Sequence, residues 1–181
     1  MLQIVVPQRE YYNRSTNQFV YTKEQKLNLE HSLVSVSKWE SKFCKPFLYT
    51  FEKSPTDEEI RYYVKCMTLT QNVDDNVYAS LSRENIEEVF KYINSEMTAT
   101  TFHKGVSKPS RELVTSELVY YWMTQCNIPF ECQKWHFNRL LTLIRVCNVK
   151  SQPPKKRSAA EIAERYRIEN ERRKKEWNTK G

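Results

Sequence analysis

The chain has 181 residues, of which 39% are hydrophobic, 13% are aromatic and only two are glycine. This composition excludes a disordered chain, and the length suits one compact domain with an appendage. The formal net charge is +7, from 29 basic and 22 acidic residues. Residues 150–181 hold 11 of the basic and 5 of the acidic residues, so residues 1–149 are nearly neutral and the excess charge belongs to the C-terminal tail.

Residues 1–30 alternate between apolar and polar side chains, a pattern typical of strands with one buried face. The apolar positions are Leu2 and Ile4, then Phe19 and Tyr21, then Leu27 and Leu29. Turn-forming residues at Asn13 to Gln18 separate the first two runs. We therefore expect a small antiparallel sheet of two or three strands, covered by helices.

Capping residues mark the starts of the expected helices in residues 31–150. Ser32 caps one that ends before Pro46, and residues 44–55 are expected to form a loop. Thr56 and Glu59 have the spacing of a capping box, and Ser82 caps a further helix. Residues 97–110 contain one of the two glycines and a proline, and are expected to form a loop.

Two further helices are expected to form the centre of the core. The first follows Ser110 and stops near Asn127, and the second runs from Pro129 to Cys147. The apolar stripe of the first comprises Val114, Leu118, Tyr121 and Trp122, and that of the second comprises Phe137, Leu140, Leu141, Ile144 and Cys147. Lys134, Asn138 and Arg145 lie opposite the second stripe.

Residues 151–181 are predicted to form a linker and a basic C-terminal helix. Pro153 and Pro154 end the preceding helix, and Ser158 to Glu161 repeats the capping-box spacing. Ile162, Ala163 and Tyr166 share one face, which then becomes polar. The expected fold is α+β and mostly α, with a single globular domain at 1–150 (sheet 1–30, helical body 31–150) and the tail at 151–181.

The sequence offers little that is typical of an enzyme. With Gly105 and Gly181 as its only glycines, the chain has no glycine-rich phosphate loop, and its three histidines adjoin no nucleophile motif. Cys132 and His136 are four residues apart, on one face of the expected helix, but their spacings to the other cysteines favour core thiols over zinc ligands. We predict a non-enzymatic protein with reduced cysteines, no metal and no cofactor.

The tail carries the chemistry of a partner-binding site. Its basic residues could contact phosphate, its Glu–Arg spacings could support a solvated helix, and Trp177 beside arginine is typical of a protein interface. Docking on a protein and a solvated helix are weighed equally, ahead of nucleic acid. The candidate binding residues are Lys155, Lys156, Arg157, Tyr166, Arg172, Arg173, Lys174, Lys175 and Trp177.

Several segments together resemble a family of small proteins encoded in the tail-gene clusters of long-tailed phages and prophages, the tail assembly chaperones. The similarity covers nearly the whole chain, and its most distinctive part is Ile128–Asn148. The segments are LEHSLVSVSKWESKFCKPF, CMTLT, MTATTF, SELVYYWM, IPFECQKWHFNRLLTLIRVCN and PPKKRS with ERRKKEWNTKG.

The resemblance implies a non-enzymatic protein of the host cytoplasm that keeps the tape measure protein soluble and helps tail tube protein to assemble around it. The absence of an apolar run of 18 residues, and of a signal-peptide pattern at the start, leads us to expect no membrane association. Two alternatives stay open: a structural component of the virion, such as a connector or completion protein, and a phage protein that binds nucleic acid. Homo-oligomers are compatible with all three.

Overall fold

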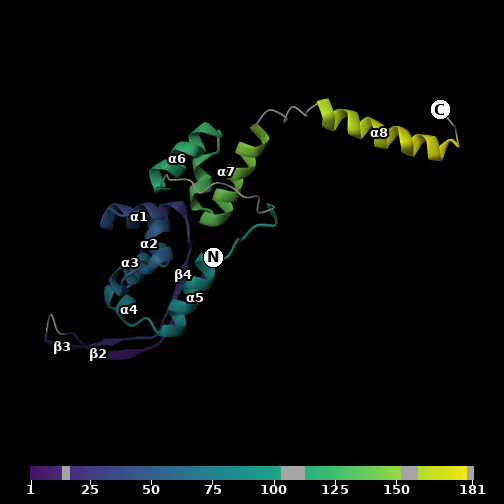
Figure 1. The fold of residues 1–181 in the computed structure, drawn as a ribbon. Coiled ribbons are helices and arrows are strands. Elements are labelled where there is room, and N and C mark those ends of the chain that lie inside the picture. The colour runs from purple at the N-terminus through teal and green to yellow at the C-terminus, as the bar shows by residue number, and fades with distance from the viewer. Residues whose placement is uncertain (14–16, 103–112, 152–158, 179–181) are drawn as a thin grey trace. The chain divides into compact units, whose positions relative to one another are not determined.

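The computed structural model describes residues 1–13, 17–102, 113–151 and 159–178 (Figure 1). The chain divides into two compact units, Met1–Asn148 and Val149–Gly181. In chain order the elements are β1 (Leu2–Val6), β2 (Arg9–Asn13), β3 (Gln18–Thr22), β4 (Gln25–Leu29), α1 (Leu33–Phe43), α2 (Phe47–Lys53), α3 (Asp57–Met67), α4 (Asp75–Ala79), α5 (Arg83–Ile93), α6 (Ser116–Gln125), the 3₁₀ helix η1 (Phe130–Lys134), α7 (Phe137–Ser151) and α8 (Ala159–Glu176). The expected α+β architecture, mostly helical, is confirmed.

The N-terminal strands form a two-stranded antiparallel ribbon in two parts. β1 pairs with β4, from Leu2 opposite Leu29 to Val6 opposite Gln25, and β2 pairs with β3, from Arg9 opposite Thr22 to Asn13 opposite Gln18. The register is the same in both parts, so Pro7 separates two ladders that would otherwise be continuous. Proline has no N–H to donate, which accounts for a break at this position.

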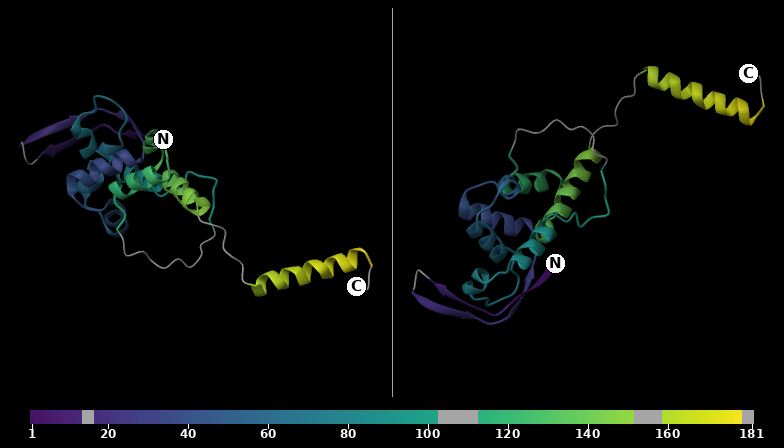
Figure 2. Two further views of the ribbon diagram at one scale, coloured as in Figure 1. Left: turned by 90° about the horizontal axis from the view of Figure 1, so that it is seen from above. Right: turned by 60° about the horizontal axis from the view of Figure 1, so that its bottom comes forward.

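The buried face of the ribbon changes between its two parts. In β1 and β4 one face is buried under the helices; its side chains are Ile4, Val6, Leu27 and Leu29. The same face of β2 and β3 is exposed, and the opposite face packs near α4, where the Thr22 and Ser80 hydroxyls are 2.9 Å apart. Figure 2 shows β2 and β3 extending beyond the helices. The expectation that all the alternating apolar residues face inward is therefore wrong for Phe19 and Tyr21, which are exposed.

The predicted helix starts at Ser32, Thr56 and Ser82 are confirmed. Each side-chain oxygen accepts a hydrogen bond from the backbone N–H three residues later, and each later side chain bonds back to the cap. The reciprocal bond comes from Glu59 in α3, as predicted, and from Ser35 and Asn85 in the other two helices. A side chain that satisfies an otherwise unpaired N–H group contributes about 1 kcal/mol, so these caps fix where the helices begin.

The loop expected at residues 44–55 instead contains α2. Pro46 is the N-cap residue of this helix, and its missing N–H costs nothing there because the first N–H groups of a helix have no partner within it. The N–H of Phe47 donates to the buried Glu40 Oε1 at 2.8 Å. The ring of Phe47 is buried against Trp39, Tyr63 and Phe51. Burial of aromatic side chains therefore outweighs the loop signal given by two prolines.

The single helix expected from Pro129 to Cys147 is also wrong. η1 ends at Lys134, Trp135 is extended, and α7 begins at Phe137, whose N–H donates to the His31 carbonyl oxygen at 2.8 Å. His136 forms an isolated β-bridge with Ser32, and this pairing interrupts the helix that was predicted from Pro129 to Cys147. The predicted inward stripe of α7 is confirmed at Phe137, Leu140 and Ile144, which are buried.

The inward face of α6 differs by one position from the expected one. Val119 and Met123 are fully buried, whereas Tyr121 is 57% exposed. Successive residues of a helix point about 100° apart, so two adjacent aromatic residues cannot both face the core. Tertiary contacts decide which face of the helix is buried.

Candidate functional site

Helix α8 is the candidate docking element, and its described side chains are almost all exposed to solvent. Of the sequence-predicted site residues, Tyr166, Arg172, Arg173, Lys174, Lys175 and Trp177 lie on α8 or directly after it. Lys155, Lys156 and Arg157 lie outside the described residues, as does the predicted cap at Ser158. The basic C-terminal helix is thus confirmed as an element, and its cap stays a prediction.

Three large apolar side chains share one face of this helix: Ile162, Tyr166 and Trp177, which are 42%, 66% and 69% exposed. Their separations of 4 and 11 residues correspond to about one and three turns of 3.6 residues. Trp177 follows α8 but keeps its register, because its N–H donates to the Arg173 carbonyl oxygen at 2.9 Å. The expected polar interruption is present, since Asn170 and Arg173 occupy the same face between Tyr166 and Trp177.

Ion pairs within α8 neutralise much of its charge. Glu169 Oε1 lies 3.2 Å from Arg172 Nη2 and 3.3 Å from Arg173 Nε, which confirms the predicted pair of Glu169 with Arg173. Arg167 pairs with Glu164 at 3.3 Å. Such exposed pairs stabilise a helix by only a few tenths of a kcal/mol each. The helix AAEIAERYRIENERRKKE has six basic and five acidic residues, so most of the excess charge of the tail lies outside it.

Lys174 and Lys175 differ from these arginines. Among the described residues neither lies within ion-pair distance of a carboxylate, and they stand three and two residues before the exposed Trp177, with Glu176 between. The end of α8 therefore combines two available cations with one large aromatic side chain. This composition suits an apolar groove with an acidic rim on a protein partner.

A second exposed apolar surface lies on the ribbon, on the outer face of β2 and β3. Tyr12, Phe19 and Tyr21 are 49%, 72% and 62% exposed, and the rings of Tyr12 and Phe19 are 5.2 Å apart in an edge-to-face arrangement. Sequence reasoning missed this surface because the alternation is the same as in a buried strand. The only signal was Pro7, which allows the ribbon to present opposite faces before and after it.

Two histidines that are distant in sequence meet in the core. The rings of His31 and His136 are 5.0 Å apart, and His31 Nδ1 is hydrogen-bonded to the Tyr63 hydroxyl. Burial, followed by the repulsion of His136, lowers the pKa of His31 to about 3, and burial lowers the pKa of His136. Because both side chains are at most 5% exposed, they are packed in the core and out of reach of a substrate.

The structure places the two residues considered as zinc ligands in different elements. Cys132 lies in η1 and His136 in the following bridge, where its Nε2 lies 3.1 Å from the Tyr92 carbonyl oxygen. Within the described ranges, no three His, Cys, Asp or Glu side chains cluster so as to hold a metal ion. In the same part of the chain, no helix has the length and apolar character needed to cross a bilayer.

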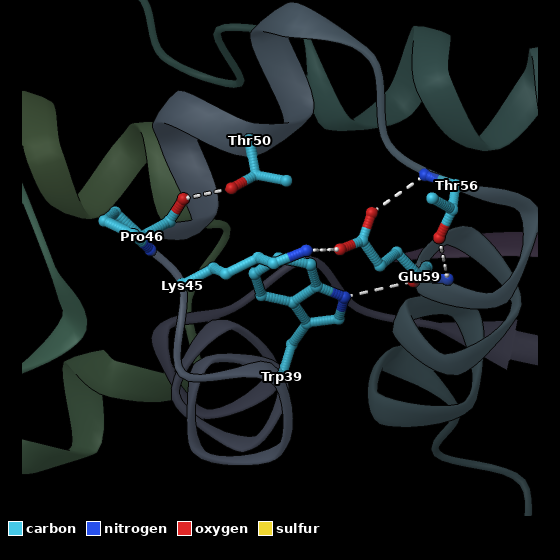
Figure 3. A network of polar contacts seen from close by, with 6 residues as sticks. All are labelled: Trp39, Lys45, Pro46, Thr50, Thr56 and Glu59. Carbon is cyan, nitrogen blue, oxygen red and sulfur yellow. Dashed lines mark hydrogen bonds and ion pairs between the residues drawn. The ribbon is translucent and has the colours of Figure 1, made fainter.

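A second buried network shows how the core positions its helices (Figure 3). The Glu59 carboxylate accepts from Lys45 Nζ and from the Thr56 N–H, both at 2.8 Å, while its own carbonyl oxygen accepts from Trp39 Nε1 at 3.0 Å. The hydrogen bond from Lys45, followed by that from Thr56, lowers the pKa of Glu59. These contacts join α1 to α3, so the network is structural.

Comparisons with protein-family models, with curated proteins and with solved structures find no match.

Proposed function

We propose that this chain is a non-enzymatic tail assembly chaperone, whose folded body carries α8 as a docking helix for the tape measure protein. The observation that supports the proposal is the face of α8 that carries Ile162, Tyr166 and Trp177, three large apolar side chains that are exposed. Most helical stability in proteins comes from packing of an apolar face rather than from helix propensity, so a partner that buries this face also stabilises the helix.

The sequence resemblance supplies the identity of the partner. Tail assembly chaperones hold the tape measure protein soluble while tail tube protein assembles around it, and such a role requires a folded body and an accessible recruiting segment. The exposed α8 and the nearly neutral body agree with this division. The proposed site of action is the host cytoplasm, before the tail is complete.

Two features of α8 favour a protein partner over nucleic acid. Arg167, Arg172 and Arg173 are already paired with glutamates on the same helix, and the helix is close to neutral overall. A phosphate-binding arm gains its affinity from unpaired cations that displace counterions. The apolar side chains instead supply the anchors that protein interfaces use.

Co-expression with the tape measure protein of the same gene cluster tests the proposal. We expect soluble tape measure protein to co-purify with the full chain, and to precipitate with a chain in which Tyr166 and Trp177 are alanine. Ile168→Ala is the matched control, because Ile168 is also exposed but lies on the opposite face of α8. Equal solubility with all three chains would refute the proposal.

Two further measurements separate the alternatives. Mass spectrometry of purified virions that detects the chain in stoichiometric amounts would favour a structural component over a chaperone. Binding to DNA that weakens steeply with salt would favour a nucleic-acid-binding protein, since displaced counterions produce such a slope.

A further inference from the structure

The C-terminal ends of α6 and α7 bring two cysteines together. Cys126 is the C-cap residue of α6, and Cys147 lies in the second half of α7. The Cys126 Sγ donates to Asn148 Oδ1 at 3.7 Å, which places it against the turn of α7 that carries Cys147. Burial, followed by the neighbouring Cys147 thiol, raises the pKa of the Cys126 thiol.

The other three cysteines lack such a neighbour arrangement. Cys44 is exposed at the end of α1, Cys66 is half-buried in α3, and Cys132 is buried in η1. Cys126 and Cys147 are both half-buried and pack against the core, so a small reagent can reach them while their backbones stay in place.

We propose that Cys126 and Cys147 form a reversible intramolecular disulfide when the protein meets a small-molecule disulfide such as oxidised glutathione. In the first step one thiol loses its proton, its sulfur attacks the reagent, and one glutathione thiolate leaves. In the second step the other cysteine, also deprotonated, attacks the mixed disulfide and expels the remaining glutathione half. One protein disulfide and two molecules of reduced glutathione result, so the two cysteines are oxidised and the reagent is reduced.

Proximity favours this closure over simple glutathionylation. A thiol held beside the mixed disulfide attacks it intramolecularly, at an effective concentration far above that of glutathione in solution. The new bond closes a loop of 22 residues, from 126 to 147 inclusive, within one folded unit. Cys126 is at a helix end, where a small backbone adjustment can meet the dihedral preference of a disulfide.

The local environment slows the formation of the disulfide but favours the disulfide once it has formed. Burial, followed by the Cys147 thiol, raises the pKa of Cys126, so the attacking thiolate is scarce at neutral pH and exchange is slow. Because this environment does not stabilise a thiolate, the reduced form of the two cysteines gains no extra stability, and the disulfide is favoured once it has formed.

The position of the bond gives it a structural consequence. Cys147 immediately precedes Asn148, the last residue of the first compact unit. A disulfide would fix the final turns of α7 to α6 at the point where the chain leaves the body. This inference is independent of the function proposed for α8.

Incubation of the folded full chain with oxidised and reduced glutathione at about pH 8.5, where thiolates are populated, tests the inference. Cys44→Ser is a suitable background, because it removes the exposed thiol. We expect the intact mass to fall by two hydrogen atoms. Trypsin with a glutamyl endopeptidase, which cuts after Glu131 and so separates Cys126 from Cys132, should yield one linked pair containing Cys126 and Cys147.

Adding Cys126→Ser to this background should abolish the loss of two hydrogen atoms, with unchanged circular dichroism as the folding control. Stable glutathione adducts on Cys126 or Cys147 without a link between them would overturn the inference. A disulfide that involves Cys66 or Cys132 in the chain that retains Cys126 would also overturn the inference.

Discussion

Replacing Glu59 by glutamine changes one atom of a buried side chain that holds two helices together. The Glu59 side chain is 4% exposed, and its two oxygens accept from Lys45 and from the Thr56 N–H. In Glu59→Gln the amide oxygen can keep the bond to Thr56, but the amide NH₂ then faces the ammonium group of Lys45, donor against donor. The capping box survives, and the charged hydrogen bond between α3 and Lys45, in the link from α1 to α2, is lost.

The structure limits the size of this effect. Losing a charged hydrogen bond costs about 1.5–3 kcal/mol when both groups are buried. The Lys45 side chain is 54% exposed and can turn to water, so we expect a loss in the free energy of unfolding near the lower end, about 1–2 kcal/mol. For a chain of this size that corresponds to a fall in Tm of about 2–8 °C.

Thermal and urea denaturation followed by circular dichroism measure this change, with Lys45→Gln and the double variant completing a cycle. The pKa of Glu59 is lowered in the folded state, so its ionised form contributes stability above the unfolded pKa, and this contribution is lost as pH falls through the folded pKa. The difference between the native chain and Glu59→Gln should therefore shrink below about pH 4. Equal stability at pH 7, or a difference that does not change with pH, would refute the reasoning.

Three further predictions follow from the body of the protein. Removing residues 152–181 should leave the Tm within about 2 °C, because the buried core ends at Ile144; a clearly lower Tm or the loss of the cooperative thermal transition would show that the tail belongs to the core. His31→Gln should flatten the fall in stability between about pH 6.5 and 3, where the unfolded chain binds a proton at His31 that the folded chain does not; an unchanged pH profile would contradict this. Thr22→Val should cost about 1–2 kcal/mol in urea denaturation, since it removes bonds to Ser80 and to the Arg9 carbonyl oxygen, and no loss would show that these bonds are dispensable.

Local chemistry made several elements predictable from the sequence. The helix starts at Ser32, Thr56 and Ser82 depend on hydrogen bonds within four residues, and the inward stripe of α7 depends only on helical spacing. The pairing of Glu169 with Arg173 is similarly local. Each of these features depends on residues that are close together in the sequence, so the sequence alone is enough to predict it.

The sequence-based predictions were wrong where contacts between residues distant in sequence determine the local structure. α2 forms because Phe47 is buried among aromatic rings and bonds to Glu40, and α7 begins late because His136 pairs with Ser32. The exposed face of β2 and β3 depends on which side of the ribbon meets α4. The contact of Cys126 with Asn148 of α7, 22 residues later in the chain, was likewise beyond any local pattern.

The candidate site was predictable in composition but not in charge balance. Tyr166 and Trp177 were predicted to be interface residues, and the structure shows that both side chains are exposed. The structure adds that α8 pairs three of its arginines internally, whereas Lys174 and Lys175, near Trp177, have no carboxylate partner among the described residues.

The most direct test of the account is a binding titration of the purified chain with tape measure protein, or with helical segments of it, by isothermal calorimetry. One interface anchor of about 2 kcal/mol corresponds to about 30-fold in Kd, so the Tyr166→Ala, Trp177→Ala chain, which loses two anchors, should bind at least about 30-fold more weakly, while Ile168→Ala stays within about threefold of the native chain. Affinities that are equal for all three chains, or weakened equally by both sets of substitutions, would contradict docking through this face of α8.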